Sequence, residues 1–207
     1  MADAHDTADA QESKGLRERK QARVRAELIE AAMRLFLRQG FDETTVDQIA
    51  EAAEVSRRTL FRYFQTKGDI LMAWTRGTSD FLEAALQARP RRETPLQSLR
   101  EIFTELAEQL ASNNVDAYAV ALMIDRDPSL RQYSLQKHAE WEDRLAAVFI
   151  ERFGASASSE QRAWLLARIG VASFRTALDQ WIAVQGRTAM RSHLIETFAL
   201  LDRSLVS

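Results

Sequence analysis

Residues 44–67 read TTVDQIAEAAEVSRRTLFRYFQTK and contain two short apolar-periodic segments separated by a tight break. Thr45 stands just before the first segment with Gln48 three residues later, which is the spacing of a capping box at a helix start. The apolar residues that follow recur at the i, i+3, i+4 and i+7 spacing of a single helix face: Val46, Ile49, Ala50 and Ala53. This segment is therefore predicted to form a short amphipathic helix.

The second segment follows a break at Glu54-Val55, and Ser56 is placed to cap a helix that begins at Arg57. Leu60 and Phe64 share a face at i, i+4 and are expected to pack inward. The remaining residues point elsewhere: Arg57, Arg58, Thr59, Arg62 and Tyr63. Guanidinium groups crowded on one short helix repel each other, which favours an anionic partner over a merely solvated basic face. Two short helices around a tight turn, the second basic, indicate a helix-turn-helix DNA reader.

The same stretch closely resembles the DNA-binding signature of the TetR family of bacterial transcriptional regulators. The similarity runs without a gap from Gly40-Phe41 to Lys67 and includes the Thr-Thr-Val opening, the Ile-Ala pair, the Val-Ser turn and the Tyr-Phe…Lys ending. The resemblance implies an all-α fold of about nine helices, with a three-helix DNA-binding domain followed by a helical effector-binding and dimerisation domain. It also implies a ligand-responsive transcriptional regulator, in most cases a repressor that its effector releases from DNA.

Two positions depart from the family pattern. Glu54 stands where glycine is common in the turn, and a residue with a Cβ atom is strained there if the backbone needs a positive φ. Phe61 stands where a tyrosine often donates to a phosphate, and phenylalanine cannot make that contact. The geometry of the DNA contacts at these two positions is therefore left open by the sequence.

The chain has 207 residues, of which 46% are hydrophobic and 28% charged, an ordinary balance for a globular protein. Only 3 Pro and 7 Gly occur, and no run of β-branched residues is long enough to suggest a sheet, so helix is expected throughout. There is no apolar stretch near the length of a membrane span and no secretory signal, and with 0 Cys no disulfide is expected, which suggests a cytoplasmic protein. The formal net charge is −2, yet Lys and Arg outnumber Asp and Glu in residues 14–67. This local excess suits phosphate contacts.

Domain boundaries follow from breaks in composition and periodicity. Residues 1–15 are predicted to be a disordered acidic tail, residues 16–67 the helix-turn-helix domain, and residues 68–207 the effector-binding and dimerisation domain. A connecting helix, residues 68–88, opens the last of these. Further helices are expected over 16–39, 94–114, 115–125, 127–152, 158–185 and 188–205.

The predicted DNA contacts divide into two classes. Side chains at the start of the second short helix are expected to reach base edges, while hydroxyl and ammonium groups around the motif hold phosphates. The resemblance adds the basic start of the first helix as a phosphate-contacting arm, for which a frayed, solvated helix end is the alternative. The full predicted set is Arg17, Lys20, Thr44, Thr45, Ser56, Arg57, Arg58, Thr59, Arg62, Tyr63 and Lys67.

The second half is rich in aromatic residues, which suits a small-molecule pocket, although ordinary core packing explains any single one of them. The resemblance favours the pocket, and the predicted lining is Phe103, Tyr118, Met123, Trp141, Phe149, Trp164, Phe174 and Arg175. Further polar candidates are Asn113, Gln136, His138 and Arg168. The segment Asp127-Pro128-Ser129-Leu130-Arg131 through Trp141-Glu142 resembles actinobacterial mycofactocin-associated regulators, some of which are thought to respond to acyl-CoA thioesters. A small, largely apolar or acyl-CoA-like effector is therefore expected.

The last two long helices are predicted to form a homodimer interface by pairing with their counterparts in a four-helix arrangement. The residues assigned to it are Ile169, Ser173, Ala177, Trp181, Leu194, Phe198 and Leu201. The alternative is that these apolar faces pack into the core of a single subunit.

An enzyme is the rival class of function. His5, His138 and His193 are scattered, and the chain has no phosphate-binding glycine loop or nucleophile elbow, so no catalytic residue, metal or cofactor is expected. A helical adaptor or ligand-binding protein without sequence-specific DNA binding is a second alternative, but it does not explain the Arg57–Lys67 string. Operator sequence, effector identity, target genes and the choice between repression and activation are not encoded in any motif.

Overall fold

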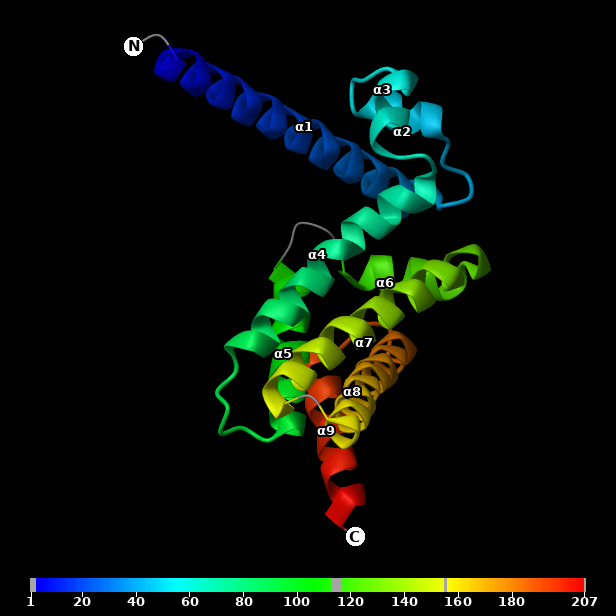
Figure 1. Ribbon diagram of the computed structural model, residues 1–207. Helices are drawn as coiled ribbons and strands as arrows, with labels where there is room; N and C mark the ends of the chain where they lie inside the picture. Colours follow the sequence, from blue (N-terminus) through cyan, green and yellow to red (C-terminus); the bar gives the residue numbers. More distant parts are fainter. Residues whose placement is uncertain (1–2, 113–116, 155, 207) are drawn as a thin grey trace. The chain divides into compact units, whose positions relative to one another are not determined.

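The structure, a computed structural model, describes the backbone of residues 3–112, 117–154 and 156–206. Side chains are described in these ranges except at residues 3–14, 16 and 204–206. The described residues form nine α-helices, one short 3-10 helix and no strand, so the predicted all-α fold is confirmed (Figure 1). The helices are α1 (Asp3–Gln39), α2 (Val46–Ala52), α3 (Arg57–Tyr63), α4 (Lys67–Ala88), α5 (Pro95–Ser112), α6 (Ala117–Arg126), η1 (Pro128–Leu130), α7 (Arg131–Phe153), α8 (Ala157–Ala183) and α9 (Met190–Val206). Within these residues no helix combines the length and apolarity that a membrane crossing requires.

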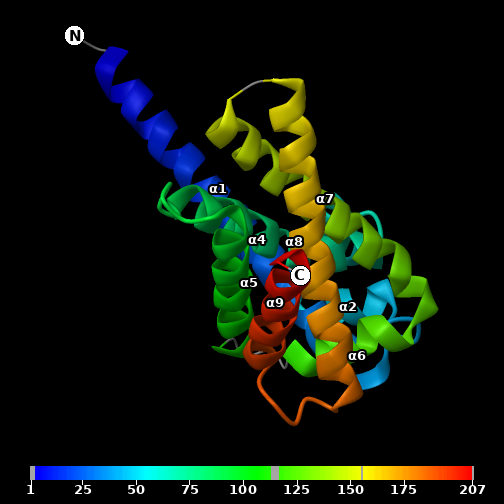
Figure 2. The same cartoon turned by 90° about the horizontal axis from the view of Figure 1, so that it is seen from below.

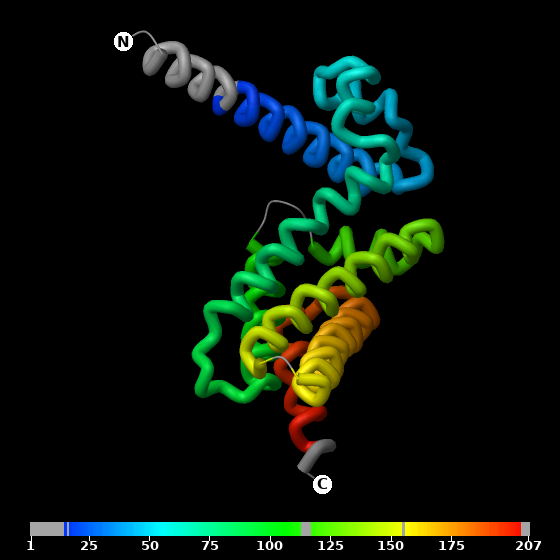
Figure 3. Tube along the Cα trace, viewed as in Figure 1, coloured from blue at the N-terminus to red at the C-terminus, as the bar shows by residue number. Residues whose placement is uncertain are grey.

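The chain divides into two compact units, Met1–Trp74 and Thr75–Ser207. The division falls inside α4, so this helix contributes residues to both units, as its path in Figure 3 shows. The sequence placed the boundary at the start of α4 instead. Arg76 and Gly77 lie next to the boundary, but the helix continues through them to Ala88, so the sequence pattern shows no break there.

The first unit is organised around the second half of α1. Leu28, Ala31 and Phe36 lie along one face of α1 and are buried, and α2 packs against this helix. Gly40 ends α1 with a φ of 93° while its N–H donates to the carbonyl of Phe36 at 2.9 Å. This left-handed conformation suits glycine, which has no Cβ atom to clash. The rings of Phe36 and Phe41 then meet at 4.9 Å between centroids, closing the turn.

Helix α1 begins at Asp3, earlier than the predicted start at Leu16. Alanine favours helix, acidic residues suit a helix N-terminus, and a single Gly15 costs only about 1 kcal/mol relative to alanine. Of the segment predicted to be a disordered tail, residues 1–15, the described residues 3–15 coincide with this part of α1. Its side chains up to residue 14 lie outside those described.

The second unit is built around α8, which packs against α7 on one side and α9 on another, while α5 contacts both α8 and α9 (Figure 2). Gly170 permits the approach of α5, because a Cβ atom there would lie 2.8 Å from Leu99 Cδ2. The core of the unit is aromatic and aliphatic, with Phe103, Trp141 and Phe149 almost completely buried. Such dense packing fixes the side chains that line any cavity next to it.

Apart from α1, the predicted helix starts lie within a few residues of the observed ones, and α9 begins at Met190 and not at Thr188. Thr94 and Gln97 form the expected capping box before Pro95, with hydrogen bonds of 3.0 and 3.2 Å. Helix α8 begins at Ala157 and not at Ser158, because Ser156 has the extended backbone of an N-cap and its Oγ accepts from the Ser159 N–H. Asn113 and the junction between α5 and α6 lie outside the described residues.

Candidate functional site

The helix-turn-helix is formed as predicted from its caps. The N–H of Thr45 donates to Gln48 Oε1 at 2.9 Å and the N–H of Gln48 donates to Thr45 Oγ1 at 3.2 Å, which is a complete capping box. Ser56 caps α3 by accepting from the Thr59 N–H at 3.1 Å. Leu60 at 0% exposure and Phe64 at 4% exposure anchor α3 inward. The opposite face of α3 is thereby directed outward.

The turn between α2 and α3 has the positive φ that its family pattern suggests. Glu54 has a φ of 53°, and the N–H of Val55 donates to the carbonyl of Ala50 at 2.9 Å. The turn thus forms without glycine, and Glu54 bears the steric cost of the left-handed region, which is about 1–2 kcal/mol for a residue with a Cβ atom.

The outward face of α3 carries three guanidinium groups in different surroundings. Arg57 forms a 3.1 Å ion pair with Asp47 of α2, and its guanidinium also lies 5.4 Å from the ring centroid of Phe61. Arg62 lies 5.1 Å from the ring centroid of Tyr63 and donates to its hydroxyl oxygen at 3.3 Å. Arg58 is exposed. The aromatic residues orient Arg57 and Arg62, so the basic face is partly ordered before any partner binds.

Helix α1 brings further positive charge to the first unit. Arg17 and Lys20 are exposed, in keeping with the predicted arm, and Arg23 forms a 2.8 Å ion pair with Glu27. Arg25 lies with its guanidinium 5.4 Å from the ring centroid of Phe64. This contact ties the basic part of α1 to the end of α3.

Thr44 and Lys67 are placed differently from the prediction that they contact phosphates. Thr44 is 1% exposed and its hydroxyl donates to the carbonyl of Gly40 at 2.7 Å. The Lys67 ammonium donates to the carbonyl oxygens of Phe41, Asp42 and Thr44 at 2.6, 3.0 and 3.4 Å. These donors form hydrogen bonds within the protein. The sequence pattern did not predict this, because a lysine that ends a basic motif resembles a surface residue.

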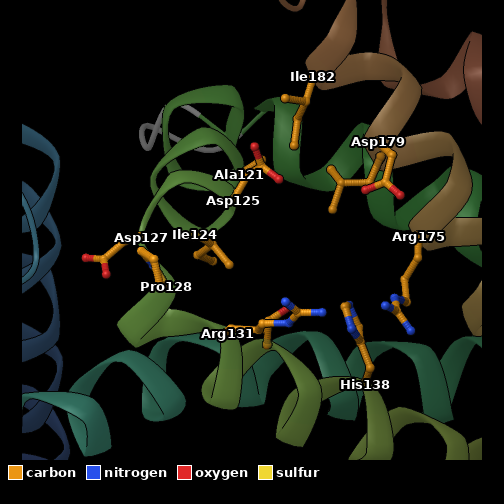
Figure 4. Close-up of a pocket in the computed structure, with 12 residues that line it drawn as sticks. Ala121, Ile124, Asp125, Asp127, Pro128, Arg131, His138, Arg175, Asp179 and Ile182 are labelled. Carbon is orange, nitrogen blue, oxygen red and sulfur yellow. The ribbon is translucent and has the colours of Figure 1, made fainter.

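A cavity of about 420 Å³ lies in the second unit, among α6, α7, α8 and the Asp127-Pro128 segment. Figure 4 shows Arg131 and His138 of α7 and Arg175 of α8 directed into it, with Asp125 on α6 and Asp179 next to Arg175 on α8. Its apolar lining comes from α6 and α8: Ala121, Ile124, Leu178 and Ile182. A cavity of this size can hold a small organic molecule.

His138 is the buried polar residue of this cavity. It is 6% exposed, and neither ring nitrogen has a hydrogen-bond partner among the described residues. Its ring packs edge-on against Trp141 and Phe174, at 5.4 and 6.4 Å between centroids. Burial first, and then the charges of Lys137 and Arg175, lower the pKa of His138 to about 3, so the imidazole is neutral at physiological pH.

Of the residues predicted to line a pocket, Arg175 and the polar candidate His138 line this cavity. Phe103, Trp141 and Phe174 instead form an aromatic cluster in the core, with Phe103–Phe174 and Trp141–Phe174 centroids 5.3 and 5.0 Å apart. Phe149 lines a separate cavity of about 250 Å³ and is 0% exposed. Large apolar side chains are drawn into the core because burying them removes the most apolar surface from water.

The other predicted pocket residues lie elsewhere in the unit. Tyr118 packs edge-on against Trp181 with centroids 5.3 Å apart, Trp164 lies 5.3 Å from the Arg168 guanidinium, and Met123 is half-buried. The sequence missed Arg131 and Ser134, which share a face of α7 with His138 at i, i+3 and i+7. That spacing was a usable signal, since helix positions three, four and seven apart fall on one side.

The predicted dimer residues mostly face the core of the second unit. Ser173, Ala177, Trp181, Leu194 and Phe198 are buried within this one chain, and Ile169 and Leu201 are half-buried. Among the described side chains of the same two helices, the large apolar ones that remain exposed are Leu165, Ile195 and Leu200. The alternative of core packing therefore describes the placement of most of these residues.

Among the described residues no group of three His, Cys, Asp or Glu side chains is arranged to hold a metal ion.

Comparison with known proteins gives a consistent picture. Residues 28–73 match the model of bacterial regulatory proteins of the tetR family, and residues 93–206 match the model of the MftR C-terminal domain. The HTH-type transcriptional regulator TcmR of Streptomyces glaucescens is 32% identical over 86% of this chain and 82% of its own length. The putative mycofactocin biosynthesis transcriptional regulator MftR of Mycobacterium tuberculosis is 29% identical over 74% of this chain and 77% of its own length.

Among solved structures, the TetR-family transcriptional repressor FadR of Thermus thermophilus, in complex with lauroyl-CoA, is similar with a TM-score of 0.53 and 25% identity. It matches over 86% of this chain and 92% of its own. A SmeT–triclosan complex shares the fold with a TM-score of 0.62 at 18% identity, over 86% of this chain and 90% of its own.

Proposed function

Because the chain belongs to the TetR family of bacterial regulatory proteins, we propose that it is a homodimeric repressor that binds operator DNA in the cytoplasm and releases it when a small molecule occupies the cavity of the second unit. The observation that carries the DNA-binding part is the outward basic face of α3, set by the Thr45 and Ser56 caps. The DNA contacts that we propose are Arg57, Arg58, Thr59 and Arg62 at base edges, and Arg17, Lys20, Thr45, Ser56 and Tyr63 at phosphates.

The experiment that tests DNA reading compares Arg58→Ala with Arg34→Ala. Arg34 lies on α1, is exposed and pairs with Glu30 at 2.6 Å, so it is a matched loss of charge outside the proposed contacts. Arg58→Ala is expected to weaken cognate binding by about 1–3 kcal/mol and to relax sequence preference. Binding titrations on the DNA upstream of the gene, at several salt concentrations, provide the measurement. Equal losses for both variants, with specificity unchanged, would favour the alternative of an adaptor without sequence-specific DNA binding.

We propose that the dimer forms through the exposed faces of α8 and α9. Leu165 is 58% exposed and Ile195 is 42% exposed, which is unusual for large apolar side chains on helices whose other faces form the core. A two-fold dimer places its recognition helices about 34–36 Å apart, one turn of B-DNA. Leu165→Glu is expected to yield monomers by analytical ultracentrifugation, whereas Leu135→Glu, a change at an equally exposed leucine on α7, leaves the dimer intact.

The second unit supports the effector part of the proposal. The cavity opens among α6, α7 and α8, and similar repressors include one crystallised with lauroyl-CoA. Helix α4 contributes residues to both units. A ligand in the second unit that shifts α4 therefore also acts on the first unit. Coupling is reciprocal, so saturating operator DNA weakens effector binding by the same factor, about 5- to 150-fold for a typical coupling. Calorimetry with and without operator measures it, and equal affinities would exclude allosteric release by that ligand.

A further inference from the structure

Charged side chains line the cavity. Arg131 and His138 come from α7 and Arg175 from α8, and all three point into the cavity in Figure 4. Among the described residues neither arginine forms an ion pair within the cavity or outside it. By contrast Asp127 is engaged, because its Oδ1 accepts from the N–H and the hydroxyl of Ser129 at 2.9 and 2.7 Å. Arg131 and Arg175 therefore offer the cavity guanidinium groups that form no ion pair among the described residues.

The unpartnered ring nitrogens of His138 indicate what kind of ligand group would bind here. A buried donor or acceptor without a partner is unfavourable, and His138 has both, because a neutral imidazole carries one N–H and one bare nitrogen. The charges that act on it are the cations Lys137 and Arg175, and no carboxylate is among the causes that shift its pKa. The charged groups that act on the ring are thus cations, which favours an anionic oxygen as the missing partner.

The rest of the cavity limits the size and charge of the ligand. Ile124, Leu178 and Ile182 offer apolar surface for a hydrocarbon body. Asp125 of α6 and Asp179, one turn from Arg175 on α8, also line the cavity, so a ligand with two or more negative charges meets repulsion from these carboxylates. A carboxylate has a single charge and two oxygens in one plane, which match a guanidinium and still leave a lone pair for an imidazole N–H.

We propose that the cavity binds a monoanionic organic acid whose carboxylate lies between His138 and Arg175, with Arg131 adding to its attraction and the apolar body lying on the α6 and α8 residues. The inference rests on the proposed function only in treating this ligand as the effector. Binding itself is a property of the second unit and can be measured without DNA.

The test uses two acids with different bodies, octanoate and 2-naphthoate, each paired with its neutral primary amide. Calorimetry gives the affinities, and NMR spectra of protein with isotope-labelled histidine report the site, because the chain has only 3 His. At least one acid is expected to shift the His138 signals and to bind about tenfold or more tightly than its amide, the size expected for a charge-assisted hydrogen bond. The signals of His193, which bonds the Thr188 hydroxyl at 2.7 Å, serve as an internal reference.

Variants then test whether His138 and Arg175 cause the preference for the acid over its amide. Arg175→Met and His138→Gln are each expected to reduce the acid-over-amide preference to within about threefold, well under one charge-assisted hydrogen bond. Arg168→Met is the control, because Arg168 lies on the same helix, does not line the cavity and pairs with Glu142 at 3.6 Å. Its preference for the acid is expected to remain that of the wild type.

Several results would overturn the inference. Equal binding of acid and amide, an unshifted His138 with both acids, or a full acid preference in Arg175→Met would each do so. The role of the ligand in regulation is separated by adding operator DNA. An acid that binds at His138 without releasing DNA leaves the carboxylate site standing and removes the proposed effector role. A neutral compound that shifts His138 and releases DNA, where both acids fail, supports the regulator and overturns the acid site.

Discussion

The two units of this protein use charged side chains in opposite ways. In the first, arginines project from the outer face of α3 and are steadied by the rings of Phe61 and Tyr63. In the second, Arg131 and Arg175 line a cavity beside a buried imidazole, and the large rings lie behind them in the core. The outward arrangement suits an extended polyanion, and the cavity suits a small molecule. The same residue type thus serves two recognition tasks, distinguished by what surrounds it.

The largest expected effect tests the assignment of aromatic residues to the core of the second unit. Phe103 is 0% exposed and meets Phe174 and Trp141 at 5.3 and 6.0 Å between centroids. Phe103→Ala is expected to lower the free energy of unfolding by about 3–5 kcal/mol, measured by urea denaturation. Leu135→Ala, at a side chain 50% exposed, is expected to stay within about 0.5 kcal/mol. Loss of ligand affinity at unchanged stability would instead restore Phe103 to a ligand pocket.

The buried, neutral imidazole of His138 in the second unit also predicts acid sensitivity. The pKa of His138 is about 3 in the folded protein, against about 6.5 for an unfolded histidine, so the unfolded chain binds the extra proton between these values. The free energy of unfolding is therefore expected to fall as the pH drops below 6.5, with a slope that approaches about 1.4 kcal/mol per pH unit until the pH nears the folded pKa.

Denaturation of the wild type and of His138→Gln between pH 6.5 and 5 measures this contribution as the difference in slope. The neighbouring charges are Lys137 on α7, whose pKa of about 8 places its titration outside this window, and Arg131, Arg175, Asp125 and Asp179 around the cavity. Parallel slopes in the two proteins would show that His138 is not held neutral by burial.

In the first unit, substitution of Lys67 tests whether its ammonium stabilises the fold or contacts DNA. Lys67→Met keeps the aliphatic stem and removes the three hydrogen bonds to carbonyls, and we expect a loss of about 1.5–3 kcal/mol in the free energy of unfolding. The salt dependence of DNA binding should change little. Lys20→Met, at an exposed position of α1, is the control, and it should lower the salt slope by about 1 without affecting stability. The reverse pattern would return Lys67 to the phosphate contacts.

The smallest expected effect compares the same backbone strain in both units. Glu54 in the first unit and Gln185 in the second have φ values of 53° and 58°. Glycine at either position removes the Cβ clash but adds freedom to the unfolded chain, so we expect each substitution to stabilise its unit by at most about 1 kcal/mol. Thermal unfolding of Glu54→Gly and Gln185→Gly provides the measurement. A destabilised Glu54→Gly would mean that the Glu54 side chain contributes a favourable contact that outweighs its strain.

The contrast between the units also explains what could be predicted from sequence. The caps at Thr45 and Ser56 and the inward anchors Leu60 and Phe64 act over three or four residues, so local spacing was sufficient to find them. The cavity joins side chains from positions 121 to 182, and which of them meet depends on how α6, α7 and α8 pack. The aromatic content correctly indicated that the second unit holds a cavity, but the aromatic residues themselves form the core behind that cavity. The hydrogen-bond partners of Lys67 were not predicted for the same reason, because they lie on the turn after α1, far from Lys67 in sequence.

Helix α8 packs into the core with one face and lines the cavity with another, and this separation affects how the protein can evolve. Its buried face, including Ala167, Val171 and Phe174, holds the core, while Arg175 and Asp179 are exposed toward the cavity. Substitutions at exposed positions usually change stability by less than about 0.5 kcal/mol, whereas core changes cost several times more. Descendants of this protein can therefore exchange cavity residues and acquire new ligands while the helix that supports them stays folded.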